Sequence, residues 1–330
     1  MIKKVLLTFI IIFISIYPKT YELLPFNKVI IWGHKLHTHT HSYIHYAFHK
    51  TFSYLGYNTY WLDNNDDVSN FNFSNALFIT EGQVDGKIPL RSDCYYILHN
   101  CDQTKYNGLY NNVMFLQTYT NECLNKDVEK LDDCIYAQYS TRYLYMPWAT
   151  DLLPYEINVV KNSLYDIKKQ KIVYYNGTIW GEFFGNINEI EPFMKACQEN
   201  NILFEHNPPC NISNEFNFQT ISSAYMAPAI VGTWQKEKGY IPCRIFKNIS
   251  YGQMGITNSK TVFDLFKEKI IYNPNTYELF YDAQRNIENG NMKQILELMD
   301  FVKEKHTYIN RIDSLLSFFN EARKRYTTLP

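Results

Sequence analysis

The sequence predicts an α/β fold built from two consecutive domains. Short apolar runs alternate with stretches of helical periodicity, which indicates a doubly wound sheet with helices between its strands. Pro154 and a polar run from Lys161 to Lys171 mark a boundary near the middle of the 330 residues. A chain of this length, with 46% hydrophobic residues, can fill the cores of one large or two ordinary domains.

The first 20 residues differ in composition from the rest of the chain. Lys3 and Lys4 form a basic flank, and an apolar run of 13 residues follows from Val5 to Tyr17. A run of this length fits the core of a signal peptide and is short for a spanning helix. Because no small-x-small cleavage site follows, we expect residues 1–20 to be an uncleaved signal anchor first, a cleaved signal peptide second and a buried strand third. The anchor predicts a single-pass type II membrane protein or a protein of the secretory lumen; cleavage would predict secretion.

Charge and cysteine content restrict the function classes. The formal net charge of −1 gives no basic footprint, so we expect no nucleic-acid partner. Seven cysteines leave at least one free thiol, and no Cys-x-x-Cys spacing indicates a structural zinc site. Cys94/Cys101 and Cys123/Cys134 could form local disulfides. In a secretory compartment the chain would be a glycoprotein, with sequons at Asn72, Asn176, Asn211 and Asn248, of which we expect Asn248 to be bare because it lies inside a candidate binding segment.

The N-terminal half reads as one sheet. Val29–Trp32 is a short apolar run that ends at Gly33, and the helical stretch Ser42–Leu55 stops at Gly56. Further apolar runs predict the remaining strands at 59–62, 76–79, 95–98, 113–116 and 135–137.

A histidine-rich loop follows the first predicted strand, at the strand end where such sheets bind ligands. The loop contains His34, His37, His39 and His41. One of these could be a general base toward an acceptor hydroxyl, because imidazole titrates near neutral pH. Alternatively three of them could hold a metal ion, or the loop could simply be solvated or cap the helix. His99 and Asp102 follow another strand, where they either contact an acceptor or form a plain turn.

The C-terminal half repeats the alternation of strands and helices. Lys171–Tyr175 reads as a strand, and Gly177-Thr178 follows it with a glycine that permits close backbone approach to a ligand. We expect a helix at 187–200, a strand at 202–205, a buried strand or short helix at 221–230, a polar loop at 236–240 and helices at 261–269 and 291–304.

The stretch Arg244–Ser259 combines a helix, a glycine turn and a strand. Ile245, Phe246 and Ile249 share one apolar face, and Gly252 suits the left-handed position that ends a helix. Arg244 lies at the helix start, where unpaired backbone N–H groups attract anions, so it could clamp a diphosphate. The alternative is a surface arginine on a capped core helix.

Four segments together resemble GT-B glycosyltransferases of the CgeB-like, glycosyl-transferases-group-1 kind. They are Pro147–Asp151, Gly177-Thr178, Arg244–Asn258 and His306–Leu316. The resemblance implies a GT-B-like α/β fold, in which two Rossmann-like domains face each other across a cleft behind an N-terminal hydrophobic segment. Its domains would be an acceptor-side domain at 21–155, a donor domain at 156–305 and a C-terminal helix with a basic tail at 306–330.

The resemblance also implies the partners and the roles of individual residues. A nucleotide-sugar donor would bind the C-terminal half, with Gly177, Thr178, Gly252, Thr257 and Asn258 in the donor segments. Arg244 would stabilise the leaving diphosphate in place of a metal, so no metal and no cofactor beyond the donor are expected. Lys247 stands where the family carries a Glu on the ribose hydroxyls, which leaves the donor open.

The acceptor would be a carbohydrate or glycoconjugate. His34, His37, His39, His41, His99 and Asp102 are its candidate contacts, and the first three are also candidate bases. The histidine loop in addition resembles the start of PHP-type metal-dependent phosphoesterases. The alternatives to a transferase are therefore a metal-dependent hydrolase that uses His37, His39 and His41, or a non-catalytic carbohydrate-binding relic of the GT-B fold.

Overall fold

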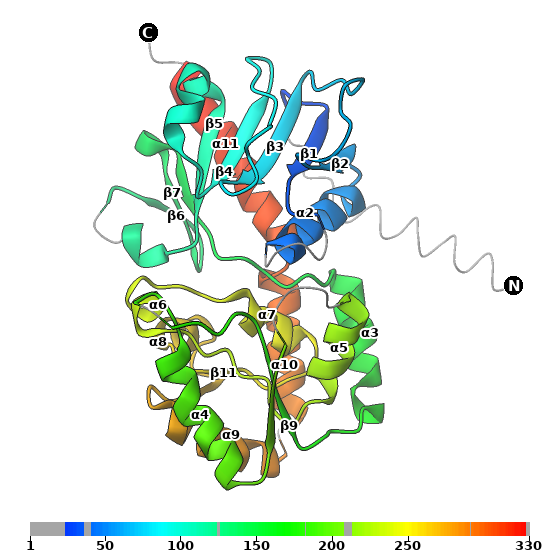
Figure 1. Cartoon of the computed structure of the whole chain (residues 1–330), viewed down its shortest axis with the longest axis vertical. Coiled ribbons are helices and arrows are strands. Elements are labelled where there is room, and N and C mark those ends of the chain that lie inside the picture. The colour runs from blue at the N-terminus through cyan, green and yellow to red at the C-terminus, as the bar shows by residue number, and fades with distance from the viewer. Residues whose placement is uncertain are drawn as a thin grey trace, which may run out of the picture.

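The computed structural model describes residues 24–35, 41–123, 126–181, 183–207, 213–290 and 292–327. Its elements form two halves stacked along the long axis of the molecule (Figure 1). The upper half in that view contains the first eight strands, and the lower half contains β9 to β12 with their helices.

The N-terminal half is built on an eight-stranded mixed sheet of order β2-β1-β3-β4-β5-β8-β7-β6. The strands from β2 to β8 in this order are parallel, whereas β6 and β7 form an antiparallel hairpin edge. The predicted strands are confirmed, and the sequence did not indicate the hairpin. The strands are β1 (Lys28–Trp32), β2 (Thr59–Leu62), β3 (Ala76–Glu81), β4 (Tyr95–His99), β5 (Val113–Gln117), β6 (Glu129–Asp132), β7 (Ile135–Gln138) and β8 (Tyr143–Tyr145).

Both faces of this sheet are apolar, because the strands are buried on two sides. One face, with Val29, Leu77 and Ile97, packs against the helix α2 (Ser42–Tyr54). The other face carries an aromatic cluster in which Phe78 and Tyr96 stack at 5.2 Å between ring centroids. Short 3₁₀ turns connect the later strands: η1 (Gln103–Asn112), η2 (Thr120–Cys123) and η3 (Tyr139–Thr141).

The C-terminal half has a smaller parallel sheet. Its strands are β9 (Ile172–Asn176), β10 (Leu203–Asn207), β11 (Ile256–Thr257) and β12 (Ile271–Tyr272). The segment 225–230 connects the two pairs. Tyr225 N–H donates to Ile172 O and Tyr174 N–H donates to Met226 O on one side, and Ala229 N–H donates to Ile256 O on the other. Isolated parallel bridges through 225–230 thus join the two strand pairs in the order β10-β9-(225–230)-β11-β12. Of the stretch 221–230, for which a buried strand or a short helix was expected, residues 221–223 end α5 and residues 225–230 are extended.

Helices flank this second sheet on both sides (Figure 1). Four of them were not predicted: α3 forms where a linker was expected, α6 occupies part of the expected polar loop, and α9 and most of α5 fall in stretches for which no helix was expected. Pro at the first helical position and Glu156 bonding back to Leu153 N–H explain why α3 begins there. The helices are α3 (Pro154–Ser163), α4 (Ile187–Glu199), α5 (Asn214–Ser223), α6 (Thr233–Glu237), α7 (Cys243–Ser250), α8 (Lys260–Leu265), α9 (Thr276–Glu288) and α10 (Met292–Lys305), with a short 3₁₀ turn η4 (Leu164–Asp166) after α3.

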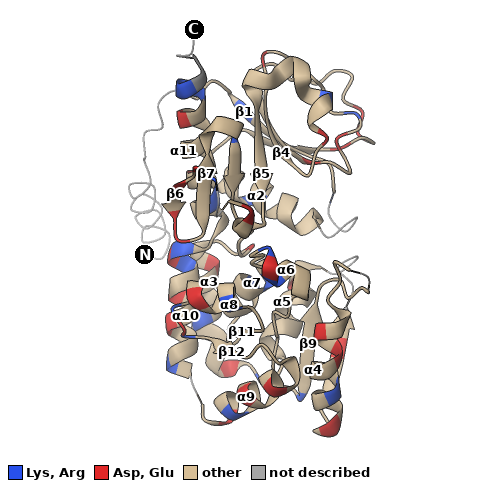
Figure 2. Ribbon diagram, turned by 90° about the vertical axis from the view of Figure 1, so that its left-hand side faces the viewer, with Lys and Arg blue, Asp and Glu red and all other residues tan. Residues whose placement is uncertain are grey.

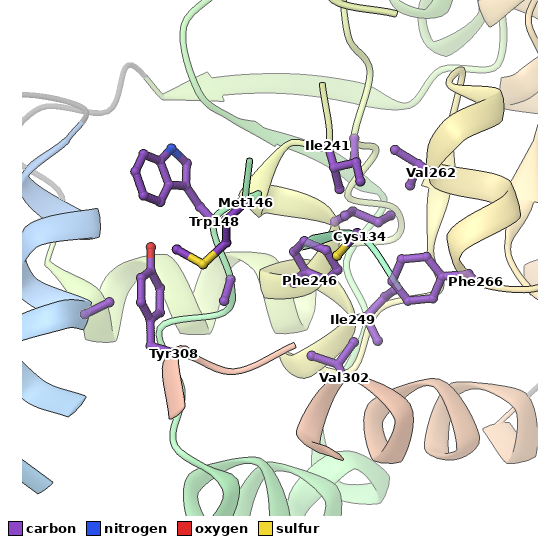
Figure 3. Packing of buried hydrophobic residues seen from close by; sticks show 14 of the residues in the cluster. Cys134, Met146, Trp148, Ile241, Phe246, Ile249, Val262, Phe266, Val302 and Tyr308 are labelled. Carbon is purple, nitrogen blue, oxygen red and sulfur yellow. The ribbon is translucent and has the colours of Figure 1, made fainter. Parts of the chain in front are cut away.

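The chain crosses between the halves twice, and the two crossings lie side by side. Thr150 and Thr307 form a parallel bridge, and Thr150 N–H donates to His306 O at 3.2 Å. Figure 3 shows Met146 and Trp148 of the first crossing near Tyr308 of the second, beside Phe246 of α7. The same apolar cluster runs through both halves and through these crossings.

The last helix, α11 (Tyr308–Thr327), returns to the N-terminal half and packs against its sheet and α2. Phe319 contacts Phe26 and Tyr95 with ring centroids 5.7 and 5.2 Å apart, and Tyr308 contacts Phe48 of α2 at 4.8 Å. The segment predicted as a separate helix and tail therefore contributes to the first core.

The structure bears on the expected membrane segment, the suggested disulfides and the sequon at Asn248. Within the described ranges no helix is both long and apolar enough to cross a bilayer, and residues 1–20 lie outside those ranges. The suggested disulfides are wrong for this structure, since both cysteine pairs are free thiols and Cys94 Sγ donates instead to Phe73 O. Asn248 is buried with its amide bonded to Ala227 O, so this sequon cannot carry a glycan in the folded chain.

Candidate functional site

A cavity of about 420 Å³ lies between the two halves. Its upper wall comes from the start of α2, its side from the first crossing, and its lower wall from the end of β9 and from α6 and α7. The residues that line it are His41, Tyr43, Ile44, Trp148, Ala149, Asp151, Asn176, Gly177, Thr178, Trp180, Asn186, Gln235, Tyr240, Cys243, Arg244, Lys247, Asn248 and Tyr308.

Arg244 lies on the lower wall, in the first turn of α7. Its guanidinium carbon is 4.4 Å from the centre of the Tyr175 ring, which gives the cation an aromatic support. Its Nη1 is buried and has no hydrogen-bond partner among the described residues. Burial lowers the pKa of Arg244 to about 10, so the side chain remains cationic at neutral pH. A half-buried cation with a buried and unused N–H donor can bind an anion.

Gly177 allows the arginine to occupy this position. It follows β9 with a φ of +145°, and a Cβ added there would lie 2.6 Å from Arg244 Nη2 and 2.9 Å from its Cζ. Only glycine leaves room for the guanidinium against the backbone. Thr178 is exposed on the cavity, and its carbonyl accepts from Asn186 Nδ2 at 3.0 Å, which holds the loop in place.

Lys247 is a second cation on the cavity wall, on the next turn of α7. Its ammonium lies 3.8 Å from Asp151 and over the rings of Tyr43 and Tyr251. The Tyr251 hydroxyl donates to both Asp151 oxygens, at 3.1 and 2.9 Å. Burial, together with the Asp151 charge, raises the pKa of Tyr251 well above its ordinary value, so the tyrosine stays a donor. Lys247 thus places a second cation on the same helix and cavity wall as Arg244.

The other residues predicted to bind the donor do not reach the cavity. Gly252 ends α7 with a φ of +83° against Leu164, and therefore shapes the helix end. Thr257 Oγ1 donates to Ala229 O, and Asn258 bonds to both backbone groups of Val231. These two side chains are buried and join the segment 225–230 to β11, which is a structural role.

Sequence reasoning missed several cavity residues. Asp151, Trp180, Gln235 and Tyr240 line the space, although none was predicted as a site residue. Asp151 lies inside the segment Pro147–Asp151, so that motif was a usable signal. Trp180 follows the Gly177-Thr178 turn and keeps 39% of its surface exposed, which leaves an aromatic face for a ligand. Nothing in the local pattern marked Gln235 or Tyr240.

A histidine and glutamate cluster lies behind the upper wall. His34 Nε2 is 2.8 Å from Glu81 Oε2, and the His34 ring stacks on His41 at 5.4 Å. His45 donates its Nδ1 proton to Gly33 O at 2.8 Å and lies 5.3 Å from the His34 ring, while His99 lies 5.5 Å from His41. Of these five residues, only His41 lines the cavity.

Burial controls the charges in this cluster. It lowers the pKa of His45 and of His99 to about 3, so both imidazoles are neutral at pH 7. Burial also raises the pKa of Glu81, but the hydrogen bonds from His34 and from Gln83 N–H outweigh it, and the net pKa lies below the ordinary value. The cluster therefore holds one carboxylate beside the neutral imidazoles of His45 and His99.

The remaining predicted acceptor residues are placed as follows. His37 and His39 lie outside the described residues. The structure puts His99 under the wall, buried against Trp148, so it supports the wall and does not face the cavity. Asp102 is exposed and caps η1 by accepting from Thr104 N–H, which makes it the plain turn that was the alternative.

Comparison with known proteins identifies related folds only among solved structures. No protein-family model matches the chain, and no curated protein matches it. An α-glucosyltransferase (AGT) in complex with UDP aligns with 88% of this chain and 99% of its own, at a TM-score of 0.53 and 9% identity. An α-glucosyltransferase in complex with UDP and a 13-mer DNA containing a central A:G mismatch gives a TM-score of 0.52, 10% identity and the same coverage. An α1,3-fucosyltransferase aligns over 93% of both chains with a TM-score of 0.45 and 13% identity.

These likenesses show the fold and nothing finer. The α/β architecture with a large mixed sheet resembles that of GT-B glycosyltransferases, which confirms the predicted fold class in outline. At such low identity the activity, the donor and the acceptor do not follow from the comparison.

Proposed function

We propose that the chain is a glycosyltransferase of the CgeB-like GT-B kind, which transfers a sugar from a nucleotide-sugar donor to a hydroxyl of a carbohydrate or glycoconjugate. The observation that carries the proposal is the Arg244 guanidinium, a cation with an unused buried donor on the wall of a cavity between two α/β halves. Solved structures of the same fold that hold UDP support the choice of a nucleotide diphosphate as the ligand.

The chemistry follows from the charge that develops during transfer. As the bond between the sugar and the diphosphate breaks, negative charge grows on the leaving phosphate oxygens. Arg244 and Lys247 are three residues apart on α7, so both cations face the same space. Placed there before the reaction, they would stabilise the leaving group as a metal ion does in other enzymes. The proposal therefore needs no metal at the diphosphate.

Gly177 and Thr178 would bring the backbone after β9 close to the phosphates. The exposed loop hydroxyl of Thr178 is a donor on the cavity, and the glycine leaves the guanidinium uncovered. The acceptor would approach the opposite wall, which His41 and Tyr43 form. Figure 2 shows both basic and acidic residues on α10, and the formal net charge of the chain is −1, so a neutral glycan is a better acceptor than a nucleic acid.

The test is nucleotide binding and sugar transfer by Arg244→Ala, compared with Arg285→Ala. Arg285 is an exposed arginine of the same half whose ion-pair partner is Asp282, so it controls for the loss of a charge. UDP, GDP and the corresponding donors are screened by calorimetry. A charge-assisted hydrogen bond contributes about 1.5–3 kcal/mol, so Arg244→Ala should bind about 10- to 150-fold more weakly.

Arg244→Lys should recover part of the lost nucleotide affinity, because lysine restores the positive charge but not the planar set of guanidinium N–H donors. Nucleotide affinity should be the same with and without a chelator. Wild-type affinity and turnover in Arg244→Ala would remove this residue from the mechanism. Binding without transfer in the native protein would instead favour the carbohydrate-binding relic.

A second candidate, a metal-dependent hydrolase, is favoured by one observation. His34, His41 and Glu81 place their ligand atoms within 4.8 Å of one another, next to the cavity. Hydrolysis of phosphoesters that stops on chelation, together with no transfer from any donor, would favour this candidate.

We also propose that residues 1–20 attach the chain to a membrane. The basic flank and apolar run support this, and the segment lies outside the described residues. Release of the full chain from membranes by high salt alone would refute it.

A further inference from the structure

We infer that His34, His41 and Glu81 form a binding site for one divalent transition-metal ion of the zinc class, on the N-terminal side of the cavity. The inference does not depend on the proposed function. It starts from the geometry, since two imidazoles and one carboxylate offer ligand atoms that all lie within 4.8 Å of one another. Two histidines and one glutamate are a ligand set that binds zinc and leaves one coordination position open.

The fold brings these residues together from distant parts of the chain. His34 follows β1, Glu81 is the last residue of β3, and His41 precedes the first turn of α2. Since β1 and β3 are parallel neighbours, their carboxyl ends meet at one edge of the sheet. His34 also has a φ of +49°, a left-handed conformation that few residues other than glycine adopt.

The side chains around this trio supply a second and independent observation. His99 is 6% exposed, and neither of its ring nitrogens has a hydrogen-bond partner among the described residues. It pairs with Glu81 across β3 and β4, and its ring lies 5.5 Å from that of His41. A buried imidazole without partners is costly unless something binds it. An ion held by the trio would place a positive charge near the His99 ring, whose unprotonated nitrogen carries an unused lone pair.

Ligand chemistry selects the class of ion. Imidazole nitrogen suits zinc, iron, cobalt, nickel and copper, whereas magnesium and calcium favour oxygen ligands. Zinc–nitrogen and zinc–oxygen bonds are about 2.0–2.2 Å long, so opposite ligand atoms lie about 3.3–4 Å apart. The ion would therefore draw the three side chains slightly closer and replace the direct contact between His34 and Glu81. His41 would then be a ligand, with one ring nitrogen used, and not a free base.

Neighbouring groups already hold Glu81 and His34 in place. Gln83 N–H donates to Glu81 Oε2 at 3.0 Å, which fixes the carboxylate. His45 is held by Gly33 O and packs on the His34 ring. Ligands oriented in this way by backbone groups are typical of metal sites.

The experiment measures metal binding directly, without an activity assay. Protein without a histidine tag is treated with a chelator, desalted and titrated with Co²⁺, whose visible absorption reports nitrogen and oxygen ligation; Zn²⁺ is then added in competition. We expect one ion per chain and displacement of Co²⁺ by Zn²⁺. Glu81→Gln and His41→Asn should each weaken binding by at least about 100-fold.

His49→Gln is the matched control, because His49 is on the same helix α2 but packs on Trp61 away from the trio. It should bind Co²⁺ like the native chain. If Glu81→Gln fails to fold, as judged by circular dichroism, the half-buried His41→Asn carries the test alone. No stoichiometric binding by the native protein, or unchanged binding in the folded trio variants, would overturn the inference. Nucleotide affinity, measured with and without the ion, reports separately on the proposed function.

Discussion

Replacement of Gly177 by alanine tests the link between the β9 loop and Arg244. The new Cβ would lie 2.6 Å from Arg244 Nη2, closer than non-bonded atoms approach, and it would sit on a backbone with a φ of +145°. The backbone strain alone costs about 1–3 kcal/mol. The clash adds to this, and the guanidinium can relieve it only by leaving its place over the Tyr175 ring.

Gly290→Ala separates these two effects. Gly290 also has a positive φ, of +68°, but an added Cβ meets nothing within 4 Å. This control should lose about 1–2 kcal/mol of unfolding free energy from strain, and its nucleotide affinity should be that of the native chain. Gly177→Ala should lose at least as much stability and bind UDP or GDP at least about 10-fold more weakly, which corresponds to about 1.4 kcal/mol.

The assay is a double-mutant cycle with Arg244→Ala, followed by calorimetry for nucleotide affinity and urea unfolding for stability. In the Arg244→Ala background the alanine at position 177 has no guanidinium to displace, so it should cause no further loss of affinity and a smaller loss of stability. Equal effects of the glycine replacement in both backgrounds would show that the two residues do not interact, and the account of the lower wall would be refuted.

Two further predictions concern Lys247 and His306. Lys247→Gln removes the second cation while keeping most of the side chain, so nucleotide affinity should fall about 10-fold and depend less on salt; an unchanged salt dependence would exclude Lys247 from the anion site. Burial, with the nearby Arg311 charge, lowers the pKa of His306 well below its ordinary value of 6.5. The unfolded chain therefore binds more protons below pH 6.5, and this histidine should cost the native chain about 2 kcal/mol of stability between pH 6.5 and pH 5. Urea unfolding of His306→Gln should show a shallower loss over this range, and an identical pH slope would contradict it.

The sequence predicts the parts of this fold that obey local rules. The parallel strands of the first sheet were found because buried strands read as short apolar runs with turn residues between them. The hairpin of β6 and β7 was missed because its exposed edge strand, Glu-Lys-Leu-Asp, has no apolar pattern. The helix α3 was missed because its polar residues resemble those of a linker, although Pro154 and Glu156 are helix-start signals.

Sequence motifs likewise identified one part of the candidate site and missed another. Arg244, Gly177 and Thr178 were identified from motifs, and the structure brings all three to one cavity. Thr257 and Asn258 belong to the same motif, yet they hold strands together, since a linear motif does not separate binding residues from those that support them. The trio of His34, His41 and Glu81 could not be predicted, because Glu81 joins the histidines only through the pairing of β1 with β3.

The return of α11 to the N-terminal half has a consequence for how the chain folds during synthesis. Phe26 and Tyr95 of the N-terminal half pack against Phe319 of α11, a residue that is synthesised only after the whole C-terminal half. Until the ribosome has released that helix, the earliest part of the chain keeps an apolar face open, while the later half can already close its own sheet. A nascent or truncated chain that stops near residue 305 would thus lack the helix that covers the first core, and we expect chaperones to bind its open face. Its defect would appear in the N-terminal half, where α11 packs in the folded chain, although the missing residues follow the C-terminal half in the sequence.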